Sequence, residues 1–210
     1  MNRTLFTILL ASVTLLTLTK QQNTAVSEAF ISYHIVPDII SQPPYNMVEV
    51  SYPSSGVQVN LGNELTPTQV KNQPIVSWDT EPGALYTLTM TDPDSPSPAN
   101  PTKREYRHWV VINVPGVDVG AGEAVVEYLG SAPPENTGFH RYVFLLYKQG
   151  GGRIQWCDKR LSNRNPNRGN FNSTKFAEKY CLGKPIAGNF FLAQYDDYVP
   201  QVQASLTDTE

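Results

Sequence analysis

The chain has 210 residues, 40% of them hydrophobic, and a formal net charge of −3 at pH 7. This length suits one domain with a sizeable core, and the weak negative charge gives no reason to expect a nucleic-acid-binding protein. The 17 prolines and 14 glycines argue against a mainly helical protein and favour short strands joined by ordered loops.

The first residues have the pattern of a secretory signal peptide. Met1-Asn2-Arg3 gives a positive start, Leu5–Leu18 is an apolar run broken only by Thr and Ser, and small residues follow. We therefore expect residues 1–25 to be a signal peptide, cleaved within Ala25–Ala29, and the mature protein to be secreted to the extracellular space. An uncleaved signal anchor is the alternative, although the run is short for a span of about 20 residues. The mature chain holds no segment apolar enough to cross a bilayer.

Short β-type runs separated by Pro, Gly, Asn and Asp recur along the mature chain, which is typical of an antiparallel β protein. We expect strands over Met47–Tyr52, Val57–Leu61, Ile75–Trp78, Leu85–Met90, His108–Val114, Ala124–Leu129, Phe139–Tyr147 and Ile186–Tyr195, and the fourth of these can extend to Asp92. Such a set of strands predicts a single, mostly β domain without internal repeats.

The predicted helices are few and short. Val36–Ile40 can form one turn, and Thr66–Val70 is either a capped short helix or a turn. Thr174–Leu182 is the best helix, because its apolar side chains form one stripe and Gly183 follows directly. A last helix begins near Asp197, and we expect residues 205–210 to be frayed.

Acidic and imidazole groups stand at the ends of the apolar strand faces. Alternation places Asp92 on the face of Leu88 and Met90, and His108 on the face of Val110, Ile112 and Val114. A carboxylate near a buried face needs a partner because desolvating an unpaired charge is expensive, and His108 is a candidate partner for Asp92.

A second polar strand end lies further along the chain. His140 heads another apolar run, on one face with Tyr142, Phe144 and Leu146. The loop before this run contains Pro133-Pro134 and little apolar content. Two polar strand ends, each headed by a histidine, suggest one shared pocket; the alternative is a pair of long turns in which Asp and Pro serve turn geometry.

Six motifs in series carry a resemblance to the phosphatidylethanolamine-binding protein family, which includes the Raf kinase inhibitor proteins. They are DPDSP, REYRHW, GSAPP, TGFHRYVFLLYKQ, LSNR and QYDDYVP, spanning Asp92 to Pro200 in order. The resemblance implies one domain over residues 30–204, with a central antiparallel sheet packed on a smaller sheet and short peripheral helices. It also implies a small anion pocket lined by Asp92, Asp94, Pro96, His108, Ala132, Pro134, His140, Tyr142 and Tyr198.

By this resemblance the chain is a non-enzymatic binding protein for phosphate-bearing headgroups such as that of phosphatidylethanolamine. Imidazoles can donate hydrogen bonds to phosphate oxygens, and a carboxylate behind one of them fixes its tautomer. The alternative is a protein that inhibits a serine protease, a kinase-type partner or another signalling protein through direct contact. A hydrolase is disfavoured because the sequence has no G-x-S-x-G, H-E-x-x-H or Walker-type motif. We expect no cofactor, no metal and a monomer.

Four positions depart from residues that are frequent in the family. Pro98 stands where arginine is common, Lys103 replaces tyrosine, Tyr106 replaces tryptophan and Ala132 replaces glycine. These departures leave the ligand selectivity open.

Two modifications follow from the expected export. Cys157 and Cys181 are the only cysteines, and in an oxidising compartment we expect them to form a disulfide, with two buried thiols as the alternative. Asn172 begins an Asn-Ser-Thr acceptor sequence for N-glycosylation, which is usable if it is exposed.

Overall fold

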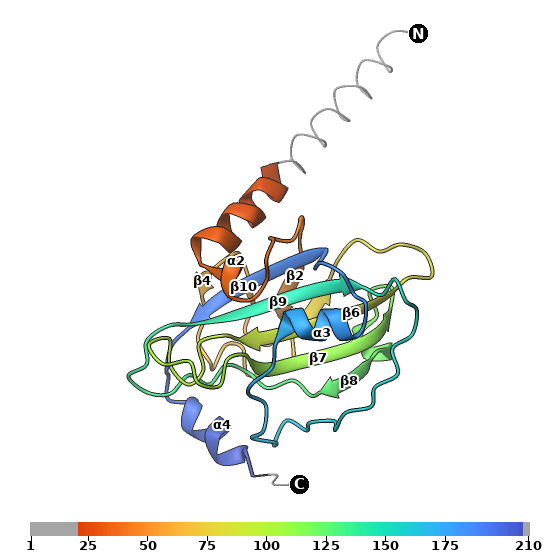
Figure 1. The fold of residues 1–210 in the computed structure, drawn as a ribbon. Coiled ribbons are helices and arrows are strands. Elements are labelled where there is room, and N and C mark those ends of the chain that lie inside the picture. The colour runs from red at the N-terminus through yellow and green to blue at the C-terminus, as the bar shows by residue number, and fades with distance from the viewer. Residues whose placement is uncertain (1–20, 208–210) are drawn as a thin grey trace.

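The structure, a computed structural model, describes residues 21–207. Two β-sheets form its centre, with short helices at their edges and over one face (Figure 1). The large sheet comprises β1 (Asn46–Met47), β4 (Asn63–Glu64), β6 (Leu85–Asp92), β7 (Tyr106–Pro115), β8 (Glu123–Val126), β9 (His140–Lys148) and β10 (Ala187–Ala193). The small sheet comprises β2 (Glu49–Tyr52), β3 (Val57–Gln58) and β5 (Ile75–Ser77). The mostly β prediction with two packed sheets is confirmed.

The long strands of the large sheet are antiparallel. Their order is β1-β10-β9-β6-β7-β8, and β10 pairs with β9, β9 with β6, β6 with β7, and β7 with β8 in antiparallel register. The short strands β1 and β4 pair with β10 in parallel, so the sheet is mixed at this edge rather than antiparallel throughout. Since β6 and β9 are antiparallel neighbours, the end of β6 lies beside the start of β9.

The large sheet is buried on both faces. Along β9, Tyr142, Phe144 and Leu146 pack against the small sheet, whereas Val143 and Leu145 pack on the other side under the helices. This division follows the alternation of side chains along a strand. A strand covered on both faces reads as a nearly continuous apolar run, which explains the strong signal of β9 in the sequence.

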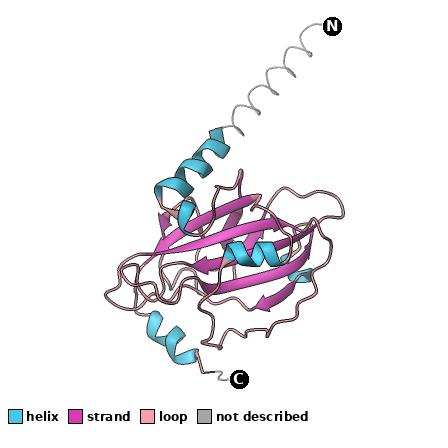
Figure 2. Ribbon diagram, in the orientation of Figure 1, coloured by secondary structure: helices cyan, strands magenta, loops and turns pink. Residues whose placement is uncertain are grey.

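Within residues 21–207, four short helical segments beside the N-terminal helix lie around the large sheet. They are α2 (Ile35–Asp38), a short 3-10 turn (Val119–Ala121), α3 (Ser173–Lys179) and α4 (Val199–Ser205). Figure 2 shows α3 lying across the face of the large sheet and α4 at its lower edge. Residues 66–70 form a turn, the second of the two predicted alternatives.

An N-terminal helix covers residues 21–32 of the described chain and was not predicted from the sequence. Its side chains Val26 and Phe30 are fully buried in the core cluster on the face of the large sheet that α3 covers. Residues 1–20, most of the predicted signal peptide, lie outside the described residues, as do residues 208–210 of the predicted frayed end. No helix within residues 21–207 has the length and apolar character needed to span a bilayer.

A β-bulge changes the face on which His108 lies. Met90 pairs with Trp109 but Thr91 pairs with Arg107, so His108 is an extra residue on β7. A bulge of this kind puts two successive side chains on nearly one side. His108 therefore contacts Tyr142 between the sheets, with ring centroids 5.0 Å apart, and the predicted face shared with Val110 is wrong.

Candidate functional site

A buried carboxylate–imidazole pair joins the end of β6 to the start of β9. Asp92 is the last residue of β6, His140 is the first of β9, and His140 Nδ1 lies 2.8 Å from Asp92 Oδ2. The other carboxylate oxygen of Asp92 accepts the Asp94 backbone N–H at 2.7 Å. Asp92 therefore has a partner, as the sequence required, but the partner is His140 and not His108.

The hydrogen bonds beyond His140 assign its protons. Thr137 donates its hydroxyl to the Pro134 carbonyl oxygen at 2.7 Å, and a carbonyl can only accept. The Thr137 proton is thus used, and His140 Nε2 must donate to Thr137 Oγ1 across 2.9 Å. The Nδ1 contact with Asp92 then requires one more proton, shared between carboxylate and imidazole. The pair is net neutral whichever atom holds that proton.

His108 is a neutral imidazole in this environment. Its Nδ1 donates to the Leu129 carbonyl oxygen at 2.9 Å, and its ring is covered by Tyr106 and Tyr142. Burial lowers the pKa of His108 from 6.5 to about 3, more than the nearby carbonyl oxygens can offset. With Nδ1 protonated, Nε2 is an acceptor.

Two buried hydroxyls among the residues of this region lack hydrogen-bond partners in the described part of the chain. They are Tyr142 Oη and Ser131 Oγ. Burial raises the pKa of Tyr142 well above its ordinary value, and the backbone amide of Ala132 lies near enough to oppose that rise without reaching hydrogen-bond geometry. Buried polar groups without partners are uncommon in folded proteins and point to an absent ligand or water.

Asp94 forms an ion pair with Arg141. Its carboxylate accepts from the Arg141 backbone N–H at 2.9 Å and from Nε and Nη2 at 2.9 and 2.7 Å. Arg104 adds a longer contact of 3.5 Å, and Arg141 also reaches Asp38. Arg141 lowers the pKa of Asp94 against the effect of burial. The predicted ligand residue is thus a clamp between the end of β6 and β9.

The remaining predicted residues lie at the edges of this site. Pro96 is half-buried and is joined to Ser95 by a cis peptide bond. Pro134 is half-buried, and its carbonyl oxygen accepts the Thr137 hydroxyl. Tyr198 lines a separate hollow of about 430 Å³ under α4, which reaches Leu129 and Gly130. Leu129 is the residue whose carbonyl receives the His108 N–H. Among the predicted residues, the structure therefore places Asp92, His140, His108 and Tyr142 together, whereas Tyr198 lines a different hollow.

Two structural residues near the site were missed in the sequence. Glu105 is buried and accepts from Thr91 and Ser173, although burial raises its pKa. Arg168 is 0% exposed and donates to backbone carbonyls of Arg107, Glu127 and three other residues. Both lie in polar stretches that look like solvated loops, and the loop around Arg168 gave no periodic signal.

The predicted disulfide is absent, since both cysteines are free and exposed. Their segments are joined in other ways: Trp156 stacks on Tyr180 with centroids 5.8 Å apart, and Lys179 pairs with Asp158. The Cys157 thiol donates a weak hydrogen bond to the Gln155 carbonyl oxygen at 3.7 Å. Packing and an ion pair therefore replace the expected covalent bond.

Asn172 is exposed and caps helix α3, accepting the Lys175 backbone N–H on its Oδ1 at 2.8 Å. Its glycosylation stays a prediction. Within residues 21–207 no cluster of three or more His, Cys, Asp or Glu side chains could hold a metal ion.

The family model of phosphatidylethanolamine-binding proteins matches residues 55–191, more than half of the chain. The chain belongs to this family. A family relative, the 26 kDa secreted antigen of Toxocara canis, is 43% identical over 79% of this chain and 63% of its own length, so the chain spans less than two thirds of that relative.

Solved structures show the same fold. The solution structure of CG7054 is 44% identical, covers 83% of this chain and 98% of its own, and has a TM-score of 0.68. The carboxypeptidase Y inhibitor, solved in complex with its cognate proteinase, is 28% identical, covers 83% of this chain and 97% of its own, and has a TM-score of 0.70. Family relatives thus include a secreted antigen and a proteinase inhibitor.

Proposed function

We propose that this family member is a non-enzymatic binding protein whose site at the end of β6 and the start of β9 takes a phosphate-bearing headgroup. The observation that carries this proposal is the unpartnered buried hydroxyl of Tyr142, two residues along β9 from His140, together with that of Ser131, which precedes Ala132 in the chain. Phosphate oxygens are acceptors, and hydroxyl donors satisfy them without adding charge. The backbone N–H groups of Ser131 and Ala132 add further neutral donors, whereas Pro133 and Pro134 have none.

The charges of the site are compatible with an anion. An isolated carboxylate would repel phosphate, but Asp92 shares a proton with His140, and Asp94 is matched by Arg141 at 2.7 Å. The predicted role of Asp94 as a ligand is therefore replaced by a role in holding the site. A headgroup that carries an ammonium has no free carboxylate to meet at Asp92 or Asp94, so we expect the phosphate to dominate recognition.

Calorimetric titration with phosphorylethanolamine tests this proposal. Tyr142→Phe removes only the hydroxyl and should weaken binding by about 10-fold or more, the usual loss for one hydrogen bond to a charged group. Tyr180→Phe is the matched control, because its hydroxyl is also buried without a partner but belongs to the α3 side of the sheet. Equal affinities for wild type and Tyr142→Phe would refute the site, and thermal unfolding of each variant checks the fold.

We also propose that the protein is secreted, which the secreted Toxocara canis relative supports. Val26 is fully buried, so cleavage after Ala25 keeps this core side chain whereas cleavage after Ser27 removes it. N-terminal sequencing of protein recovered from the culture medium tests the cleavage site. A mature chain that starts after residue 27 would contradict cleavage before Val26, although not secretion itself.

A second candidate function is inhibition of a serine carboxypeptidase, which the 28% identical inhibitor structure favours. The assay is a progress curve of carboxypeptidase Y with increasing amounts of the mature protein. Dose-dependent loss of the initial rate supports inhibition, and unchanged rates at a large molar excess exclude this enzyme as a target.

A further inference from the structure

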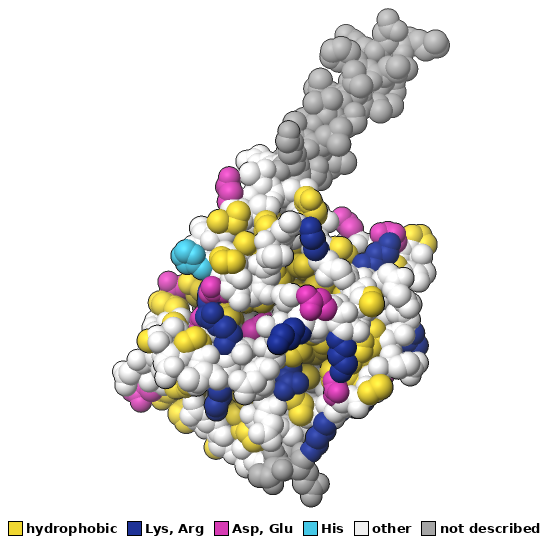
Figure 3. Space-filling model, viewed as in Figure 1, with side chains coloured by type: hydrophobic (Ala, Val, Ile, Leu, Met, Phe, Trp, Pro, Cys, Tyr) yellow, Lys and Arg dark blue, Asp and Glu magenta, His cyan; other side chains and the backbone are white. Residues whose placement is uncertain are grey.

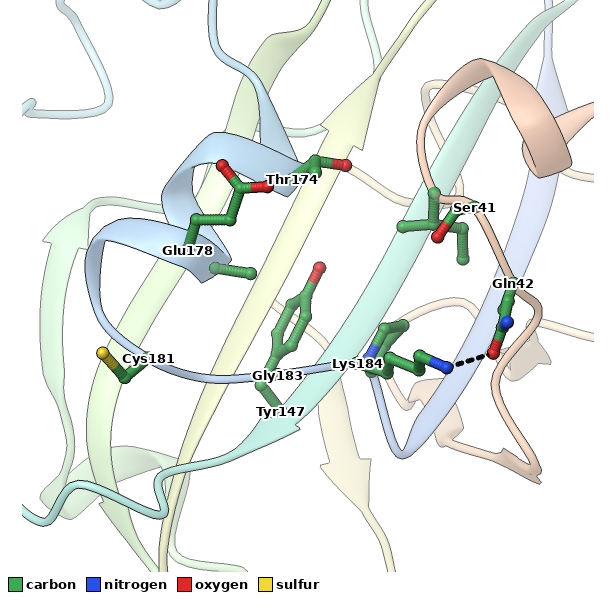
Figure 4. A pocket seen from close by; sticks show the side chains of 11 residues that line it. Ser41, Gln42, Tyr147, Thr174, Glu178, Cys181, Gly183 and Lys184 are labelled. Atoms are coloured by element: carbon green, nitrogen blue, oxygen red, sulfur yellow. Dashed lines mark hydrogen bonds between the residues drawn. The ribbon is translucent and has the colours of Figure 1, made fainter.

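A cavity lies on the opposite side of the large sheet from the proposed phosphate site. It has a volume of about 260 Å³ and lies between α3, the 181–185 segment and the 40–42 segment (Figure 4). Its lining residues include Ile40, Ala177 and Pro185, and its floor is Tyr147 of β9. Tyr147 is seven residues from His140, roughly 23 Å along the strand, and it faces the helices rather than the small sheet. The two sites are separate.

The hydroxyl of Tyr147 has no hydrogen-bond partner among the described residues. The side chain is 1% exposed, and burial raises its pKa, with the Glu105 carboxylate acting in the same direction. Figure 4 shows the ring rising from β9 with its oxygen directed toward the space between Thr174 and Ser41. The hydroxyl therefore keeps a proton that no acceptor of the described chain receives.

Three other polar side chains around the cavity are already engaged. Thr174 donates to the Ile39 carbonyl at 3.0 Å, and the Lys184 ammonium binds the Gln42 side-chain oxygen. Glu178 and Lys184 carry opposite charges on the same rim, so the cavity offers no net charge to select an ion. Figure 3 shows the same mixing of acidic and basic side chains over this face of the molecule.

We propose that this cavity is a second ligand site for a compact, neutral and mainly apolar molecule that carries one accepting oxygen, which Tyr147 binds. The volume of about 260 Å³ equals roughly eight waters at about 30 Å³ each, which suits a ligand the size of an aromatic ketone. Ile40, Ala177 and Pro185 contact the hydrocarbon part. Small-molecule sites commonly combine apolar walls with a few placed polar groups.

Acetophenone and ethylbenzene are matched probes, because they share the ring and the two-carbon side chain and differ by the carbonyl oxygen that replaces two hydrogens. Ligand-observed NMR titration should give acetophenone an affinity for wild type 5- to 20-fold above its affinity for Tyr147→Phe, an effect typical of one neutral hydrogen bond. Ethylbenzene should bind both proteins equally. Tyr180→Phe, whose unpartnered hydroxyl does not line the cavity, should behave as wild type.

The position of the ligand is tested without mutation. Intermolecular NOEs from the acetophenone methyl group to the Ala177 methyl group would place it in the cavity, and excess phosphorylethanolamine should leave these NOEs unchanged. The proposal is overturned if acetophenone does not bind, if Tyr147→Phe binds it as well as wild type, or if NOEs arise only at the β6–β9 site.

Discussion

Replacing Asp94 by asparagine separates a structural role from a binding role. Asp94 is 3% exposed, and its carboxylate is the partner of Arg141 through three hydrogen bonds. Asparagine keeps one oxygen for the Arg141 backbone N–H but loses the charge that matches the guanidinium. Breaking a buried pair costs about 3–5 kcal/mol. Asp38 and the Tyr33 carbonyl still hold Arg141, so we expect a loss of about 2–3 kcal/mol in the free energy of unfolding.

The pH dependence of this loss has a definite sign. The pKa of Asp94 is lowered in the folded state, so its stabilisation is present above the unfolded pKa of about 3.9 and is lost as pH falls through the folded value. Wild type should therefore exceed Asp94→Asn in stability by the full amount at pH 5 to 7, and the gap should shrink below about pH 4.

Urea denaturation of both proteins across this pH range is the assay. With a slope of about 2–3 kcal/mol per molar urea, the midpoint of the variant should fall by about 1 M at pH 7. Asp197→Asn, an exposed aspartate, is the matched control and should change little. A variant with wild-type stability but weaker phosphorylethanolamine binding would show that Asp94 contacts the ligand and that the clamp assignment is wrong.

Three other outcomes test the site and its surroundings. His108 should show no titration between pH 5 and 8 in ring NMR spectra, since burial lowers its pKa to about 3. The free energy of unfolding should fall as pH drops from about 6.5 toward 3, because only the unfolded chain binds this proton in that range. An ordinary titration near pH 6.5 would contradict its burial. Arg168→Met should lower stability by at least about 3 kcal/mol in urea, because several buried carbonyls lose their donor. Asn172→Ala should lower the free energy of unfolding by about 1 kcal/mol, because the helix cap is lost. Asn172→Asp keeps the cap and removes only the expected glycosylation, which mass spectrometry of the secreted protein would detect in the wild type.

Alternation along the strands made much of the fold predictable. The β9 run was regular enough to place Tyr142, Phe144 and Leu146 on one face, and the structure has them in one core cluster. The same reasoning placed Asp92 and His140 at strand ends, and antiparallel pairing of β6 with β9 brings them within 2.8 Å. Local periodicity sufficed here because both strands lack irregularities near these residues, apart from the bulge shared with β7.

Features that depend on irregular backbone or distant partners were not predictable. The bulge at His108 moves its ring to the other face, and no residue in the strand signals the insertion. Asp94 was expected to bind the ligand from the family resemblance, and its ion pair with Arg141, 47 residues later, gave no signal in the sequence. The N-terminal helix was hidden in a polar stretch, where Val26 and Phe30 alone carry the buried face. The presence of two cysteines predicted a disulfide, but their separation in the sequence does not show whether they lie close enough to bond.

Backbone amide spectra recorded during titration with phosphorylethanolamine test the central claim most directly. If the site beside the Asp92–His140 pair receives the phosphate, the largest shifts fall on the amides of Ser131 and Ala132 and of residues 140–142. The α3 segment, 173–179, should stay unchanged. Shifts concentrated on α3 or α4, or none at saturating ligand, would contradict the account.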